Sequence, residues 1–186
     1  MPYVKVSIPK KPSGGSPVPK GANIILIDVA DLAKDASGQV TGFPARDDKG
    51  VKMTGPFTLA ALAKALFIQA TPSTIKRMDT SEGGDDAMGF IQNVEFEKPG
   101  DELEFNEFVA NNINTEWIIV TTECSDSTGT RVHGTPCNPM KLKFESKDDN
   151  EAKKATLKFT TPQRSKFKMG HYTGALPAVA DVTAVV

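Results

Sequence analysis

The chain has few of the side chains that mark disulfide-bonded, metal-binding or base-stacking proteins. Among its 186 residues are two cysteines, two histidines, two tyrosines and one tryptophan. Two cysteines are too few for a disulfide scaffold. One tryptophan and two tyrosines are too few for a platform on which the bases of a single-stranded nucleic acid stack. A formal net charge of −1 gives no overall attraction to nucleic acid or to a membrane surface. The sequence therefore directs attention to packing and assembly.

Long apolar runs and targeting signals are also lacking. No run approaches the roughly 20 residues that a membrane helix needs, and residues 1–5 lack the basic-then-apolar pattern of a signal peptide. We therefore expect no membrane partner and synthesis in the cytoplasm. In that reducing compartment Cys124 and Cys137, in apparent strands on either side of a turn, would remain thiols. A disulfide closing the short loop between them is the alternative.

Signals for an enzyme are weak. His133 and His171 have no ligand spacing to each other, and a zinc site from Cys124, His133 and Cys137 would lack a fourth ligand. The acidic stretch 148–151 lacks calcium-loop spacing and is more typical of a solvated turn. We therefore predict a protein that is not an enzyme, with no catalytic residues, no metal and no cofactor.

The apolar patterns favour β-structure in a single domain, which we place at residues 22–175. Residues 23–29 form a short β-branched run that suits a strand buried on both faces, and residues 116–123 are strongly β in composition. Residues 90–97 predict a strand with one wet face. Residues 140–145 and 155–160 alternate and predict a hairpin. Its inward side chains would be Met140, Leu142, Phe144, Leu157 and Phe159.

One helix is predicted, from Glu102 to about Ile113. Asp101 stands at the N-cap position and Glu104 three residues on, as in a capping box. The candidate packing residues on its apolar stripe are Phe105, Phe108 and Val109. Residues 57–68 stay open between helix, which their alanines and leucines favour, and strand.

The ends and one long excursion lack regular patterns. Residues 1–21 mix Pro, Gly and Ser and predict an N-terminal arm. Residues 30–56 predict a long loop, with a short strand near residues 43–47, and such loops are often functional. Residues 176–186 are apolar without a partner turn and predict a C-terminal arm or an edge strand.

Charges are separated along the sequence. Residues 79–107 hold ten acidic residues against Lys98, whereas residues 141–168 hold nine basic and four acidic residues. The candidate acids for a lumen or a subunit contact are Asp79, Glu82, Asp85, Asp86, Glu95 and Glu97. The candidate contact bases are Lys141, Lys143, Lys153, Lys154 and Lys158. These charges could balance within one molecule, or the acidic face of one subunit could meet the basic face of the next.

Several stretches between Gly89 and Pro177 resemble one viral protein family. They are residues 89–96, 99–108, 120–124, 134–139 and 172–177. This part of the chain, roughly half of it, is similar to bacteriophage major tail tube proteins, particularly those of phages and prophages of Bacteroidetes. The order of elements also fits: arm, strand, long loop, strands, one helix, strands and tail.

The resemblance implies an architecture and a location. It implies a β-sandwich or partly closed barrel flanked by one helix, assembled into hexameric rings whose sheets join around a lumen and whose loops and arms bridge neighbours. The partners would be copies of itself and other tail proteins (sheath, tape measure, terminator), with duplex DNA as transient cargo. The protein would belong to the virion tail after assembly in the host cytoplasm.

Two other classes of function remain as alternatives: a secreted or surface β-sandwich that binds a partner, and a small enzyme. For a tube, duplex DNA carries one negative charge per about 1.7 Å. We therefore expect acids or neutral groups to line the bore, and lysines to lie at contacts or outside.

Overall fold

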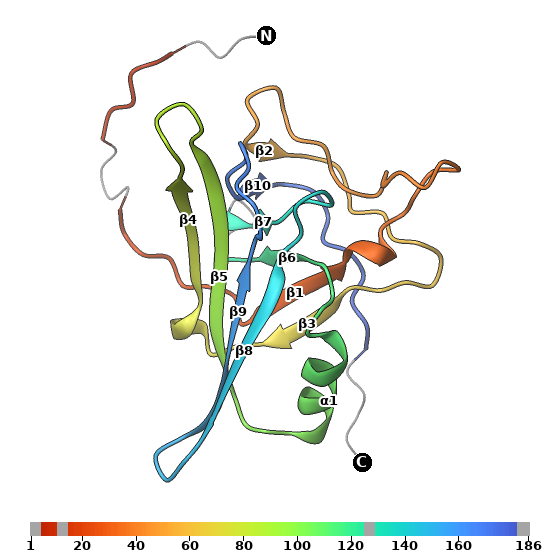
Figure 1. Ribbon diagram of the computed structural model, residues 1–186, viewed down its shortest axis with the longest axis vertical. Coiled ribbons are helices and arrows are strands. Elements are labelled where there is room, and N and C mark those ends of the chain that lie inside the picture. The colour runs from red at the N-terminus through yellow and green to blue at the C-terminus, as the bar shows by residue number, and fades with distance from the viewer. Residues whose placement is uncertain (1–4, 11–14, 125–128, 182–186) are drawn as a thin grey trace.

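The computed structural model describes residues 5–10, 15–124 and 129–181, whose strands form two sheets (Figure 1). Strand accounts for 41% of the described residues and helix, with the 3₁₀ turns, for 10%, and neither sheet is closed into a barrel. The prediction of a mainly β, α+β sandwich with one α-helix is confirmed, and both sheets are open.

The larger sheet has six strands in the order β2-β10-β7-β6-β1-β3. Their bounds are Lys52–Met53 (β2), Gly170–Tyr172 (β10), Arg131–His133 (β7), Trp117–Thr121 (β6), Asn23–Asp28 (β1) and Leu66–Gln69 (β3). The smaller sheet has four strands in the order β4-β5-β9-β8, all antiparallel to their neighbours. Their bounds are Lys76–Glu82 (β4), Gly89–Pro99 (β5), Lys153–Thr160 (β9) and Lys141–Asp148 (β8). Two 3₁₀ turns, Val29–Asp31 and Pro72–Thr74, complete the framework with helix α1 (Leu103–Asn112).

The six-stranded sheet is buried on both faces. Successive side chains of a strand point to opposite faces, and Ile24 and Leu26 of β1 enter one apolar core whereas Ile25 and Ile27 enter another. Strand β6 does the same with its own alternate residues. The unbroken apolar runs of the sequence are thus explained, because neither face of these strands meets water.

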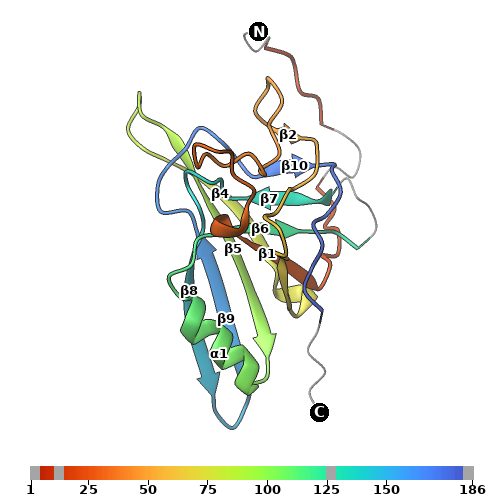
Figure 2. The same cartoon turned by 90° about the vertical axis from the view of Figure 1, so that its right-hand side faces the viewer.

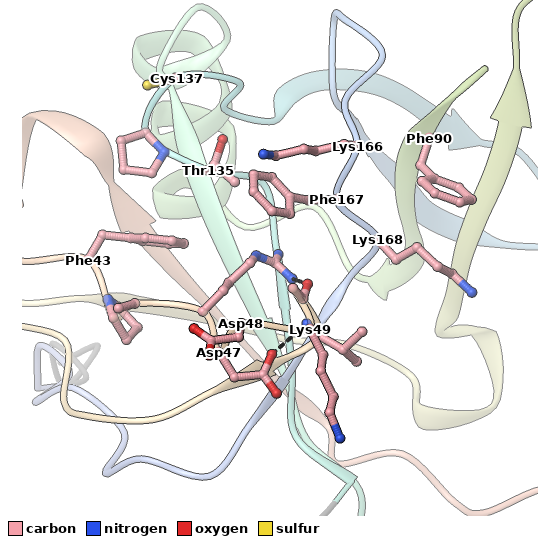
Figure 3. Close-up of a pocket in the computed structure, with 16 residues that line it drawn as sticks. Phe43, Asp47, Asp48, Lys49, Phe90, Thr135, Cys137, Lys166, Phe167 and Lys168 are labelled. Carbon is pink, nitrogen blue, oxygen red and sulfur yellow. Dashed lines mark hydrogen bonds between the residues drawn. The ribbon is translucent and has the colours of Figure 1, made fainter. Parts of the chain in front are cut away.

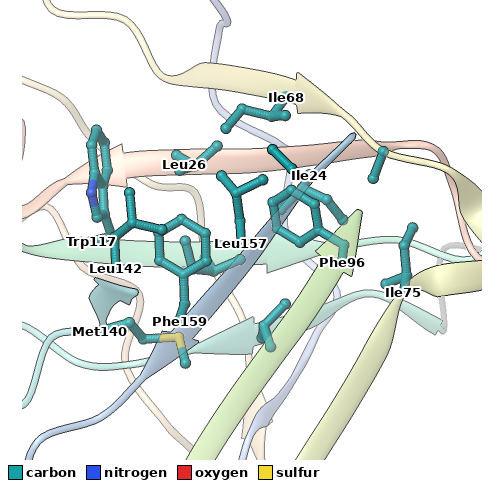
Figure 4. Packing of buried hydrophobic residues seen from close by; sticks show 14 of the residues in the cluster. Ile24, Leu26, Ile68, Ile75, Phe96, Trp117, Met140, Leu142, Leu157 and Phe159 are labelled. Carbon is teal, nitrogen blue, oxygen red and sulfur yellow. The ribbon is translucent and has the colours of Figure 1, made fainter. Parts of the chain in front are cut away.

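The first core fills the space between the two sheets. Figure 4 shows Leu26 and Trp117 of the larger sheet facing Phe96, Leu157 and Phe159 of the smaller one. The inward residues predicted for the β8–β9 hairpin are confirmed, with Phe144 only partly buried. The strands run further than predicted, and the Asp149 carboxylate accepts from the N–H groups of Glu151 and Ala152 in the turn.

The predicted long loop covers the second core. Met53 is fully buried there, and the Phe57 ring lies 5.8 Å from Phe43 and 5.2 Å from Tyr172 between ring centroids. Gly42 is required in this layer because a Cβ would collide with the carbonyl oxygen of Thr58. The loop is therefore a structural layer of the fold. In place of the short strand predicted near residues 43–47, there is a single bridge from Arg46 to Met53.

Residues 57–68 are not helical and contribute only the start of β3. The N–H of Ala65 donates to the carbonyl of Ala178, and the N–H of Ala180 donates to the carbonyl of Ala65. These bonds hold the described part of the C-terminal arm beside β3, and tertiary pairing overrides the helix propensity of the alanines. The end of the N-terminal arm is also attached, since Pro19 and Gly21 pair with Cys124 and Thr122.

Helix α1 packs beside the lower part of β8 and β9, as Figures 1 and 2 both show. Phe105 and Val109 are buried and Phe108 partly buried, so the predicted packing stripe is confirmed. The Phe105 ring lies 6.0 Å from the Phe144 ring between centroids. The capping prediction is wrong by one residue, because Glu102 is the N-cap and makes no capping bond. Instead, Glu102 pairs with Lys98, and Asp101 accepts from Asn106.

The helix stripe generates a test of the fold. Because Phe105 is 6% exposed, Phe105→Ala should lower the free energy of unfolding by about 3–5 kcal/mol. Leu103 lies on the same helix but is 69% exposed, so Leu103→Ala should change it by less than about 0.5 kcal/mol. Urea titration of both variants measures the difference. Equal losses would show that the stripe does not anchor α1.

Candidate functional site: the faces and edges of the four-stranded sheet

The outer face of the four-stranded sheet brings the predicted acids and lysines together. The register places Lys76, Glu95, Lys158 and Lys143 in one row across all four strands. Glu97, two residues after Glu95, is the next residue of β5 on this face, and Lys141 lies at the start of β8. The two charge types are separated in the sequence, but the fold places them side by side.

Many of these charges are paired within the molecule. Lys76 Nζ lies 2.8 Å from Glu95 Oε1, Lys154 Nζ lies 2.9 Å from Glu97 Oε1, and Lys153 Nζ lies 3.2 Å from Asp101 Oδ2. Lys141 pairs with Glu116 at 3.1 Å. Such exposed pairs are worth about 0–1 kcal/mol each, so their main effect is to neutralise the face. For these residues the geometry favours balance within one molecule.

Five candidate residues keep unpaired charges. Within the described part of the chain no salt bridge is formed by Glu82, Asp85, Asp86, Lys143 and Lys158. The three acids lie at the end of β4 and in the exposed β4–β5 loop, and both lysines lie on the outer face. Asp79 differs, because it faces inward, where its carboxylate accepts from the N–H of Met169, and burial raises its pKa.

In the described part of the chain β4 pairs only with β5 and β8 only with β9, so both edges are open along these strands. Just before β8, Met140 is bonded to Trp117. In antiparallel sheets alternate residues turn their backbone groups to one neighbour or the other. The Gln92 carbonyl accepts from the N–H of Thr161, so the backbone groups of Gln92 point toward β9. The backbone N–H and carbonyl of its β4 partner Asp79 therefore point away from β5, to the open edge. By the same alternation Ser81 points outward. On β8, Asp149 bonds to Ala152, so the N–H of Ser146 points away from β9.

A buried polar network joins the two sheets at one end. Arg77 of β4 donates to the carbonyl of Gly129 (3.0 Å) and to the carboxylate of Glu123. Burial opposes the charge of Glu123, but the bonds from Arg77 and Lys20 outweigh it and lower its pKa. Beside them Thr121 Oγ1 lies 3.2 Å from Nε2 of His133, which is fully buried. The network fixes β4 to the larger sheet.

An open groove of about 840 Å³ lies next to this network (Figure 3). It is formed by the loop 43–51, the turn 135–137 and the segment 166–168, together with Phe90. Gln92 holds two of these walls in place, because its side chain donates to the Phe167 carbonyl (3.0 Å) and accepts from Gly134 N–H (2.9 Å). Of its walls only the loop 43–51 lies in a segment that the sequence marks as a candidate, the long loop 30–56, because the remaining residues are far apart in the chain and follow no periodicity.

The described residues contain no group of three or more His, Cys, Asp or Glu positioned to hold a metal ion. His133 is buried, while Cys124 and Cys137 are exposed free thiols and lie outside the strands in which they were expected. No helix in the described ranges has the length and apolarity to cross a bilayer. Comparisons of the chain with protein-family models, with curated proteins and with solved structures found no match.

Burial lowers the pKa of His133 to about 3 from 6.5, with Arg77 and Arg131 acting in the same direction. Between pH 6.5 and pH 3 the unfolded chain binds a proton at this histidine and the folded protein does not. The free energy of unfolding must therefore fall as the pH drops through this range. Proton binding at His133 alone should lower the free energy of unfolding of the protein by about 2 kcal/mol between pH 7 and pH 5.

The variant His133→Gln should lose that part of the pH dependence. Urea titrations at pH 7 and pH 5 should give a smaller difference for His133→Gln than for the parent protein. His171→Gln is the comparison: that residue is exposed on β10, and burial lowers its pKa in the same direction but by less, so His171→Gln should lose a smaller part of the pH dependence than His133→Gln. An unchanged pH dependence in His133→Gln would contradict the buried, neutral histidine.

Proposed function

We propose that this chain is a structural subunit that joins copies of itself, through the edges of the four-stranded sheet, into stacked rings around a lumen. The ring is the hexameric tail tube ring that the sequence resemblance implies, with duplex DNA as its cargo. The observation that carries the proposal is the pair of open edges on a sheet whose strands are seven to eleven residues long. Open edges of this length are ready templates for pairing with another chain.

The topology suits cyclic closure. Four antiparallel strands leave β4 and β8 running in opposite directions. Rotation about a ring axis preserves strand direction, so β4 of one copy would meet β8 of the next as an antiparallel neighbour. The two edges are different surfaces, so the contact is heterologous and closes into a ring or continues as a filament.

The charges favour one register for that junction. Pairing Glu82 with Lys143 of the next copy also places Lys76 opposite Asp149. A shift of two residues in one direction places Glu82 opposite Glu145, and in the other it places Lys76 opposite Lys147. Like charges directly opposite each other are destabilising. The favoured register also brings together the outward-pointing N–H groups of β4 and β8.

The same geometry favours one face of the sheet for the proposed lumen. The inner face carries the larger sheet and α1, so the outer face is the one that can line a bore. That arrangement turns Lys143 and Lys158 toward the lumen, which is incompatible with the expectation that lysines avoid it. The pairs Lys76–Glu95 and Lys154–Glu97 neutralise their neighbours. The proposed lumen is therefore of mixed charge, with few cations free to hold DNA.

A proline on the β8 edge tests the edge contact. Ser146→Pro removes an N–H that points away from β9, so the monomer should keep its fold. At the junction the neighbouring copy loses a hydrogen bond and is obstructed by the pyrrolidine ring of the proline. The concentration needed for assembly should rise about tenfold or more, measured by sedimentation velocity. Ser146→Ala is the matched control. Normal assembly of a folded Ser146→Pro protein would contradict pairing through β8.

A charge exchange tests the register. Glu82→Lys and Lys143→Glu should each weaken assembly, because each places like charges at the junction, and the double variant should recover it. Assembly should also weaken as salt rises, since exposed pairs are screened. Sedimentation at low and high salt measures both effects. A double variant no better than either single one would rule out this register.

A further inference from the structure

The groove of Figure 3 is lined by cations and aromatic rings. Arg46 and Lys166 lie over the Phe167 ring, with 4.9 Å and 5.1 Å to its centroid, and Lys168 lies over Phe90 at 5.8 Å. Lys49 is the fourth cation of the lining. Stacking on ring faces holds these side chains in place without neutralising them.

The positive charge of the groove is only partly balanced within the described chain, by Asp79, which acts on Arg46 and Lys168, and by Asp47. Lys49, Lys166 and Lys168 form no salt bridge with a described carboxylate. Arg46 donates one bond, to the Gly50 carbonyl (3.0 Å), while its Nε and Nη2 are buried without a partner. Asp79 and Asp47 offset part of its charge, and the remainder acts on a ligand through its field.

The two acids of the lining do not remove this excess. Asp47 turns its carboxylate to its own loop, where it accepts from the N–H groups of Val51 (3.0 Å) and Lys52 (3.1 Å). Asp48 is exposed at the rim. The groove thus suits a ligand that presents carboxylates together with an apolar group for the rings.

The β4–β5 loop of this chain has that chemistry. Glu82, Asp85 and Asp86 are exposed and unpaired in the described part of the molecule, and Met88 beside them is 56% exposed. Thioether sulfur makes favourable contacts with aromatic rings. Asp85 and Asp86 lie beyond the end of β4, so they project past the edge contact described above.

The proposed register brings this loop to the groove of the neighbouring copy. With Glu82 opposite Lys143, edge pairing ends near the start of the neighbour's β8, because the N–H and carbonyl of Met140 are already bonded to Trp117. The β4–β5 loop therefore leaves the edge at this point. The turn 135–138 immediately precedes that strand, and its residues Thr135, Pro136 and Cys137 form one wall of the groove. The charges of the loop and the groove thus agree with the position to which the proposed register brings the loop.

We infer that the acidic β4–β5 loop of one copy docks into the basic, aromatic groove of the next copy, with Asp85 and Asp86 against Lys166 and Lys168. The inference rests on the proposed function, because it names a second contact of the same junction. Each copy would donate one loop and accept one, which locks the neighbour's orientation beyond what edge pairing alone provides.

The native thiol at the rim provides a direct test. Cys137 is exposed and lines the groove. In a Cys124→Ser background, which leaves one native cysteine, Asp86→Cys should form an intermolecular disulfide with Cys137 under mild oxidation. Non-reducing electrophoresis should show a ladder of linked subunits, whose upper limit reports the number of copies in a ring.

Two matched variants control the experiment. Adding Cys137→Ser should abolish the ladder, and Ser73→Cys, an exposed position on a distant 3₁₀ turn, should give at least tenfold less cross-linking than Asp86→Cys. Normal assembly without a ladder, or a disulfide closed within one chain, would overturn the docking inference alone. A protein that stays monomeric by sedimentation at every concentration would overturn the proposed function as well.

Discussion

The rest of the structure depends on the six-stranded sheet having apolar side chains on both faces. β1 and β6 place alternate residues in two separate cores, so the sheet is stable only if both faces are covered. One cover is the four-stranded sheet with α1, and the other is the loop layer that includes Met53 and Phe57. The four-stranded sheet therefore turns one face to the core and leaves its outer face and both edges available.

Polar contacts determine how that sheet is held. Arg77 reaches from the edge strand β4 to Glu123 and Gly129, and Gln92 joins β5 to the segment at Phe167 and to Gly134. These bonds are buried or partly buried, where an unpaired polar group costs more than in water. They fix an edge that would otherwise be held by β5 alone. A rigid edge is pre-organised for a partner, because less ordering is needed at contact.

Elements with strong periodicity could be predicted from the sequence, and elements fixed by distant contacts could not. The apolar run of β1, the alternation of β8 and β9, and the Phe105–Val109 stripe each predict the element that the structure contains. The sequence does not predict β4, because Lys76 to Glu82 show no apolar alternation, and it is pairing with β5 that makes these residues a strand. The groove around Arg46 comes from loops remote in sequence, and only the described fold brings them together.

Pairing of β4 with β8 of another copy is the central claim, and amide hydrogen exchange resolved by residue tests it most directly. Assembled protein should be compared with dilute monomer of the same sequence. The account predicts that the outward-pointing amides of Ser81, Phe144 and Ser146 exchange rapidly in the monomer and gain protection on assembly. The amides of Thr80 and Glu145, which bond within the sheet, should change little. Equal exchange at Ser81 and Ser146 in both states would contradict the claim.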